Sequence, residues 1–105
     1  MSSPVVEQLV GEALDRLPQW VLDVLATVPI VVLDGGREAG AYGLYQGDGV
    51  ARDEVLDQIV IYSDTLVRDF GHDRELLAVE VERTLRHEIA HHLGYAEPGV
   101  AGLGL

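Results

Sequence analysis

The spacing of apolar residues over the first thirty positions predicts two helices. After Ser3 the apolar side chains recur every three or four positions, the spacing of one face of an α-helix. Ser3 suits the N-cap and Pro4 the first turn, so a helix is expected over residues 4–17. Pro18 then opens a second apolar pattern, PQWVLDVLATV, which predicts a short helix over 18–28.

Two segments rich in β-branched residues predict strands in the middle of the chain. These are IVVLD, residues 30–34, and QIVIYSD, residues 58–64. Between them, GGREAG is expected to be a glycine-rich loop, and AYGLYQGDG (41–49) an extended or turn-like segment. QIVIY is open to two interpretations: an exposed edge that receives an extended peptide, or an interior strand of the sheet.

The last third of the chain predicts a short helix and then the longest helix of the protein. Ser63 or Asp64 can cap the short helix through TLVRDF. Asp73 is the expected N-cap of the long helix, and Gly94 its left-handed stop. Apolar residues recur there every four positions: Leu77, Val81, Leu85, Ile89 and Leu93. We therefore expect one α+β domain over residues 1–105, with N-terminal helices, a small mixed or antiparallel sheet and a C-terminal helix.

That C-terminal helix contains the sequence HEIAH, residues 87–91, which matches the H-E-x-x-H pattern. Side chains four apart on a helix lie one above the other, so the imidazoles of His87 and His91 can reach one metal ion. Glu88 points about 100° around the helix and can take a proton from an attacking water without binding the ion. The chain has no cysteine, so imidazole and carboxylate are its candidate metal ligands.

A third protein ligand is expected beyond the end of the helix. A left-handed Gly94 turns the chain back, and Glu97, three positions later, can return to the neighbourhood of His91. The alternative is that Glu97 is an exposed carboxylate before a proline. His92 points away from such an ion and suits the negative end of the helix dipole, and His72 is expected in a loop.

The charge of the chain limits its partners. The formal net charge is −11, and all seven basic residues are arginine. This balance disfavours nucleic acid and anionic membrane surfaces as partners. The first residues lack the basic start of a signal peptide, and no apolar run reaches the ~20 residues of a membrane span, so a cytoplasmic location is expected.

The chain resembles the small bacterial zincin-like metallopeptidases, sometimes called minimal zincins. The similarity covers LPQWVLDVL, Asp34, GLYQG, the QIVIY strand and, most specifically, LRHEIAHHLG. The resemblance implies a zincin-type fold with one zinc ion on the motif helix. It implies His87 and His91 as ligands, Glu88 as the catalytic carboxylate and Glu97 at the acidic third position. Aspartate is more frequent there in the family, and the methionine turn of the larger metzincins has no counterpart here, since Met1 is the one methionine.

These residues predict a zinc-dependent peptidase that hydrolyses peptide or protein substrates through a water activated beside Glu88. Two alternatives stay open: a zinc-binding structural or partner-binding module with little peptidase activity, and a polar helix face that binds no metal. Eight residues follow Glu97, so a second copy or another protein is expected to complete the cleft. The candidates for oxyanion stabilisation are Tyr45, Tyr62, Tyr95 and His92.

Overall fold

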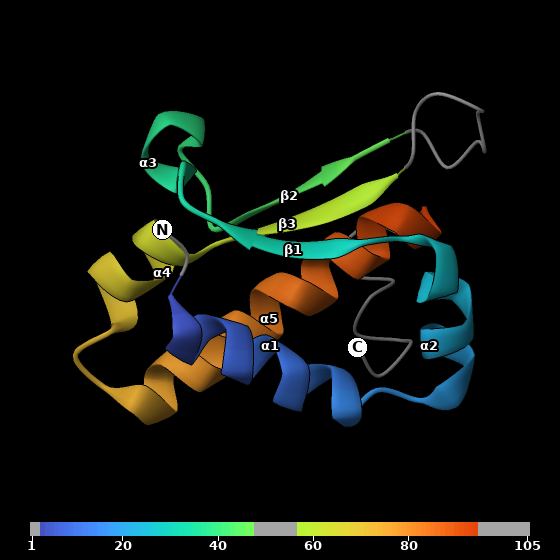
Figure 1. Cartoon of the computed structure of the whole chain (residues 1–105), viewed down its shortest axis with the longest axis horizontal. Coiled ribbons are helices and arrows are strands. Elements are labelled where there is room, and N and C mark those ends of the chain that lie inside the picture. The colour runs from blue at the N-terminus through green and yellow to red at the C-terminus, as the bar shows by residue number, and fades with distance from the viewer. Residues whose placement is uncertain (1–2, 48–56, 95–105) are drawn as a thin grey trace.

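The computed structural model describes residues 3–47 and 57–94, and there it combines helices with one three-stranded sheet. Figure 1 shows the sheet on one side of the molecule and the two longest helices, α1 (Pro4–Asp15) and α5 (Arg74–Leu93), packed beneath it. The prediction of a mixed α+β domain with a C-terminal motif helix is therefore confirmed.

The N-terminal helices follow the apolar pattern. Helix α1 covers Pro4–Asp15, and the Ser3 hydroxyl accepts a hydrogen bond from the Val6 N–H at 3.4 Å, as expected of an N-cap. It ends two residues earlier than predicted, because Pro18 disfavours helical backbone at the residue before it. Helix α2 covers Gln19–Val24 and continues as a 3₁₀ turn, η1, over Leu25–Thr27.

The sheet is mixed, with strand order β1-β3-β2. Strand β1, Ile30–Leu33, runs parallel to β3, Gln58–Tyr62, and strand β2, Gly43–Gln46, runs antiparallel to β3 on its other side. QIVIY is thus the central strand, and the interpretation of it as an exposed edge is wrong. The segment predicted as extended or turn-like contains β2, which forms an edge of the sheet among the described strands.

Two short helices lie at the end of the sheet where β1 and β3 finish. The GGREAG segment contains a helical turn, α3 (Gly36–Ala39), so the prediction of a loop there is incomplete. The Asp64 carboxylate accepts hydrogen bonds from the first N–H groups of this turn, at 2.9 and 3.3 Å. Helix α4 covers Ser63–Phe70, and it therefore includes the two residues expected at the end of the preceding strand.

Helix α5, Arg74–Leu93, has the predicted bounds. The Asp73 carboxylate accepts hydrogen bonds from the N–H groups of Glu75 and Leu76, at 3.0 and 3.2 Å. Gly94 ends the helix with φ at 80°, a left-handed conformation that glycine adopts without steric cost.

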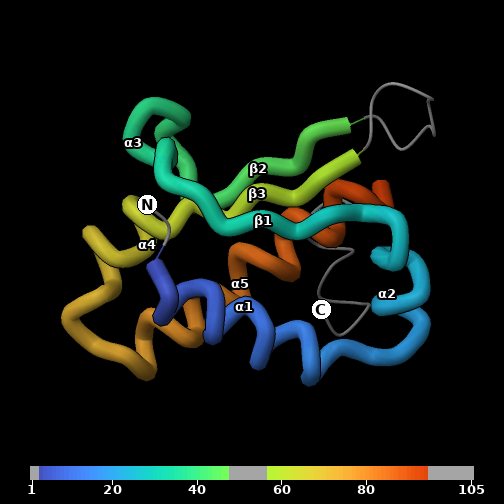
Figure 2. Tube along the Cα trace, in the orientation of Figure 1, coloured from blue at the N-terminus to red at the C-terminus, as the bar shows by residue number. Residues whose placement is uncertain are grey.

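The core lies between the sheet and the α1–α5 pair (Figure 2). Strand β3 directs alternate residues, Ile59 and Ile61, toward the helices, and α5 buries one residue in every turn against them. None of the helices within residues 3–47 and 57–94 is long and apolar enough to cross a membrane. The core side chains from the helices include Val6, Val10, Val21, Leu66, Leu77, Val81, Leu85 and Ile89.

Candidate metal centre

The two histidines of the motif lie one turn apart on α5 and converge. Nε2 of His91 lies 2.9 Å from Nε2 of His87, with ring centroids 4.6 Å apart. His87 is half-buried and His91 is exposed, so both rings are reachable from solvent. The apolar stripe of α5 anchors the opposite side of the helix in the core, and the histidines therefore face outward.

This arrangement fits two ligands of one metal ion. Two nitrogens bound tetrahedrally at 2.0–2.1 Å are separated by about 3.3 Å, close to the separation observed between the two Nε2 atoms. Within the described residues, no group of three or more histidine, cysteine, aspartate or glutamate side chains is arranged to hold an ion. Glu97, the predicted third ligand, lies outside the described residues.

Glu88 lies beside the histidines but faces the sheet. Its side chain is buried, with 7% of the residue exposed, and the backbone N–H of Tyr45 on β2 donates a hydrogen bond to its carboxylate. Burial raises the pKa of the Glu88 carboxyl above its usual value, although His87, His91 and the Tyr45 N–H act in the opposite direction. The carboxyl is therefore held between the histidines and the edge strand, with a raised proton affinity.

The outer edge of β2 faces the motif helix. The Tyr62 N–H donates to the Tyr42 carbonyl at 2.8 Å, which makes these two residues a hydrogen-bonded pair of the antiparallel ladder. Because such pairs alternate, the backbone groups of Gly43 and Tyr45 point away from β3. The hydrogen bond from the Tyr45 N–H to Glu88 agrees with this direction.

Gly43 allows β2 to approach α5 closely. A Cβ atom built at this position lies 2.7 Å from Cγ2 of Thr84 and 3.1 Å from Cγ of Glu88. A side chain larger than hydrogen would therefore push the strand away from the carboxylate. The close approach of β2 to Glu88 depends on this glycine.

A second set of polar side chains connects the C-terminal end of α5 to the β2–β3 pair. The Tyr45 hydroxyl donates to Oδ2 of Asp57 at 2.9 Å and lies 2.9 Å from Nδ1 of His92. The His92 and Asp57 side chains are only 14% and 13% exposed, and Nδ1 of His92 is 3.5 Å from Oδ2 of Asp57. We call Tyr45, Asp57 and His92 the tyrosine cluster.

Two of the side chains expected to stabilise an oxyanion, Tyr45 and His92, belong to the tyrosine cluster. The hydroxyl of Tyr45 and Nδ1 of His92 are engaged with each other and with Asp57, so these groups connect α5 to the sheet. Tyr62 alternates with Ile61 along β3 and therefore lies on the sheet face opposite α5, away from the histidines. Tyr95 lies outside the described residues, and His72 lies in the exposed turn between α4 and α5, as predicted.

Replacing Tyr45 by Phe is expected to lower the free energy of unfolding by about 1–3 kcal/mol. The substitution removes a hydroxyl that bridges a carboxylate and an imidazole in a mostly buried position, and leaves both without that hydrogen bond. Chemical denaturation measures the change. Tyr62→Phe is the matched control, since its hydroxyl makes no hydrogen bond within the described part of the chain, and an equal loss in both variants would contradict the role of the tyrosine cluster.

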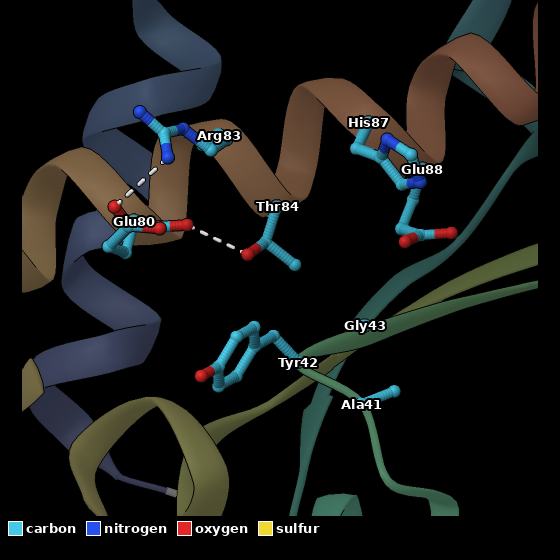
Figure 3. Close-up of a pocket in the computed structure, with 8 residues that line it drawn as sticks. All are labelled: Ala41, Tyr42, Gly43, Glu80, Arg83, Thr84, His87 and Glu88. Carbon is cyan, nitrogen blue, oxygen red and sulfur yellow. Dashed lines mark hydrogen bonds and ion pairs between the residues drawn. The ribbon is translucent and has the colours of Figure 1, made fainter. Parts of the chain in front are cut away.

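A pocket of about 440 Å³ opens next to the motif, between α5 and the start of β2 (Figure 3). His87 and Glu88 lie at one end and Glu80 at the other, and Thr84 stands between them. The Tyr42 ring lies across the pocket from Thr84. The lining residues are Ala41, Tyr42, Gly43, Glu80, Arg83, Thr84, His87 and Glu88.

Sequence reasoning identified the helix side of this site and missed most of the strand side. Gly43, Asp57 and the backbone N–H of Tyr45 reach α5 only through pairing of β2 with β3, and all three lie about thirty to forty-five residues before the motif in sequence. The H-E-x-x-H sequence carries no information about that pairing. The small residue in GLYQ was the one local indication of a close backbone approach.

Comparison with known proteins agrees with the geometry of the motif helix. The family model described as zincin-like metallopeptidase matches residues 25–104. That range includes the three strands found in the described part of the chain, together with α5 and the H-E-x-x-H sequence. A search of curated proteins gives no significant match.

Proposed function

Because this chain belongs to the zincin-like metallopeptidase family, we propose that it is a zinc-dependent peptidase with Glu88 as general base. In this proposal His87 and His91 hold one zinc ion, and Glu97 supplies the third protein ligand. The observation that carries the proposal is the convergence of the two Nε2 atoms, 2.9 Å apart, beside a buried carboxyl.

The chemistry needs a metal and a base in one place. Zinc, when bound, polarises a carbonyl group and makes a neighbouring water more acidic. Glu88 receives the proton of the attacking water and then passes it to the departing amine. Its raised pKa suits this task, because a carboxylate that binds a proton more strongly is a better base near neutral pH.

The strand edge next to Glu88 supports a peptide as the substrate. The backbone groups of Gly43 point away from β3, toward the side where α5 carries the motif. An extended peptide can pair with such an edge through main-chain hydrogen bonds. These hydrogen bonds position the scissile bond and do not depend on the side chains of the peptide. The pocket beside Glu88 can then receive one side chain of that peptide.

Replacing His91 by Ala is expected to weaken zinc binding by more than about 100-fold. Loss even of a group that only orients a metal ligand costs ~10–100-fold in affinity, and the loss of a ligand costs more. Equilibrium dialysis with elemental analysis measures zinc per chain, and peptide hydrolysis is assayed on the same samples.

His72→Ala is the matched control, because His72 is an exposed histidine in the turn before α5. It is expected to bind zinc as the wild type does. A wild type that takes up no zinc, or an equal affinity in the wild type and His91→Ala, would remove the metal site from the proposal. The interpretation of HEIAHH as a polar helix face would then stand.

A further inference from the structure

The pocket beside Glu88 has a carboxylate toward each of its two ends. Glu88 and Glu80 are eight residues apart on α5, which places them about 12 Å apart along the helix axis. In Figure 3 their carboxylates lie toward the two ends of the pocket, with Thr84 and Tyr42 between them. The pocket therefore runs from the candidate metal centre to a second carboxylate.

The middle of the pocket is apolar although it is lined by hydroxyl-bearing residues. The Thr84 hydroxyl donates to the Glu80 carbonyl oxygen at 2.7 Å, and its Cγ2 methyl faces β2. The Tyr42 hydroxyl donates to Oδ2 of Asp69 at 2.6 Å, so Tyr42 presents its ring to the pocket. A methyl group and a ring face suit an aliphatic chain more than a polar one.

The far end of the pocket carries a weakly held carboxylate. Oε1 of Glu80 lies 3.3 Å from Nη1 of Arg83, whose side chain is 73% exposed, whereas the Glu80 side chain is 15% exposed. Because the Arg83 guanidinium is exposed to solvent, this ion pair, three positions apart on a helix, contributes little and is screened by salt. A cation that enters the pocket can therefore take the place of Arg83 beside Glu80.

We infer that this pocket accepts a lysine or arginine side chain of a peptide substrate, adjacent to the bond that is cleaved. The inference rests on the proposed peptidase function. The aliphatic stem lies against the Thr84 methyl and the Tyr42 ring, and the cationic end binds the Glu80 carboxylate. The net charge of −11 favours the approach of basic peptides.

The test compares peptides that differ at one position beside the scissile bond, which holds lysine, arginine, norleucine or glutamate. With zinc-loaded wild type, kcat/KM for the basic peptides is expected to exceed that for norleucine by about 10-fold, the effect of one charged hydrogen bond. Glu80→Gln is expected to reduce the ratio of kcat/KM between the basic and the norleucine peptides to about one. Arg83→Ala is expected to increase the preference, because it frees the carboxylate.

Glu75→Gln is the matched control, since it removes one carboxylate from the exposed first turn of the same helix, away from the pocket. Equilibrium binding of the same peptides, followed by fluorescence anisotropy, tests the inference independently of turnover. The inference alone would be overturned if hydrolysis or binding showed no preference for the basic peptides. It would also be overturned if the Glu80→Gln variant kept that preference. Absence of hydrolysis with a Glu80-dependent basic preference in binding would overturn the proposed function and retain the pocket as a binding site for a basic side chain.

Discussion

Replacing Glu88 by Gln is expected to lower peptide hydrolysis by about 10²–10⁴-fold, the usual contribution of a general base. Glutamine has nearly the same shape as glutamate, and its amide oxygen can still accept the hydrogen bond from the Tyr45 N–H. It cannot take a proton from water. Zinc per chain is expected to stay unchanged, because His87 and His91 are untouched.

The measurement pairs kcat/KM with elemental analysis on the same preparation, and Glu75→Gln again serves as the matched control. An activity within a factor of two of the wild type would exclude Glu88 as the base. A wild type that binds zinc and cleaves no peptide of a diverse library would favour the alternative of a structural or partner-binding module. The two outcomes differ in the wild type, so one cannot be mistaken for the other.

The second large effect is expected from Gly43→Ala, which should lower the free energy of unfolding by about 1–3 kcal/mol. The added Cβ would lie 2.7 Å from Cγ2 of Thr84 and 3.1 Å from the Val60 carbonyl oxygen, so strand β2 must move away from α5. The φ angle at Gly43 is not positive, so the cost is steric and not conformational. The same movement separates Tyr45 from Glu88 and is expected to reduce hydrolysis.

Two further variants isolate this steric cause. In the Gly43→Ala background, Thr84→Ser removes the nearest methyl and keeps the hydroxyl, so a double-mutant cycle should show recovery of part of the lost stability. Gly11→Ala is the control, because a Cβ there meets nothing within 4 Å and lies in helix α1, where alanine is favoured. Denaturation is the measurement, and a cost at Gly43 below about 0.5 kcal/mol, the range of neutral surface changes, would contradict the prediction.

The longer helices were predictable because the residues that specify them lie within the helices or next to their ends. Ser3, Asp73 and Gly94 act on backbone groups within a few residues, and the apolar period of α5 reports its buried face directly. The strand QIVIY was also recognisable from its composition, but its place in the sheet was not. Whether a strand is central or at an edge depends on partners that no short segment contains, and here those partners are β1 and β2.

Short elements were harder to predict because few residues contribute to them. Strand β2 has four residues, and its glycine weakens any strand pattern. The helical turn α3 also has four residues, and its N-terminal N–H groups are satisfied by Asp64, which is distant in sequence. Both elements are stabilised by tertiary contacts, and the short sequence of each element does not reveal those contacts.

By itself the sequence determined the long helix, the spacing that brings His87 and His91 together, and the neighbouring carboxylate. These features follow from the 3.6-residue period of one helix and need no other part of the chain. The tertiary structure decided what surrounds them: β2 against Glu88, the tyrosine cluster at the helix end, and the pocket that runs to Glu80. Those contacts join segments far apart in sequence, so they arise from packing and strand pairing, which short-range patterns do not specify.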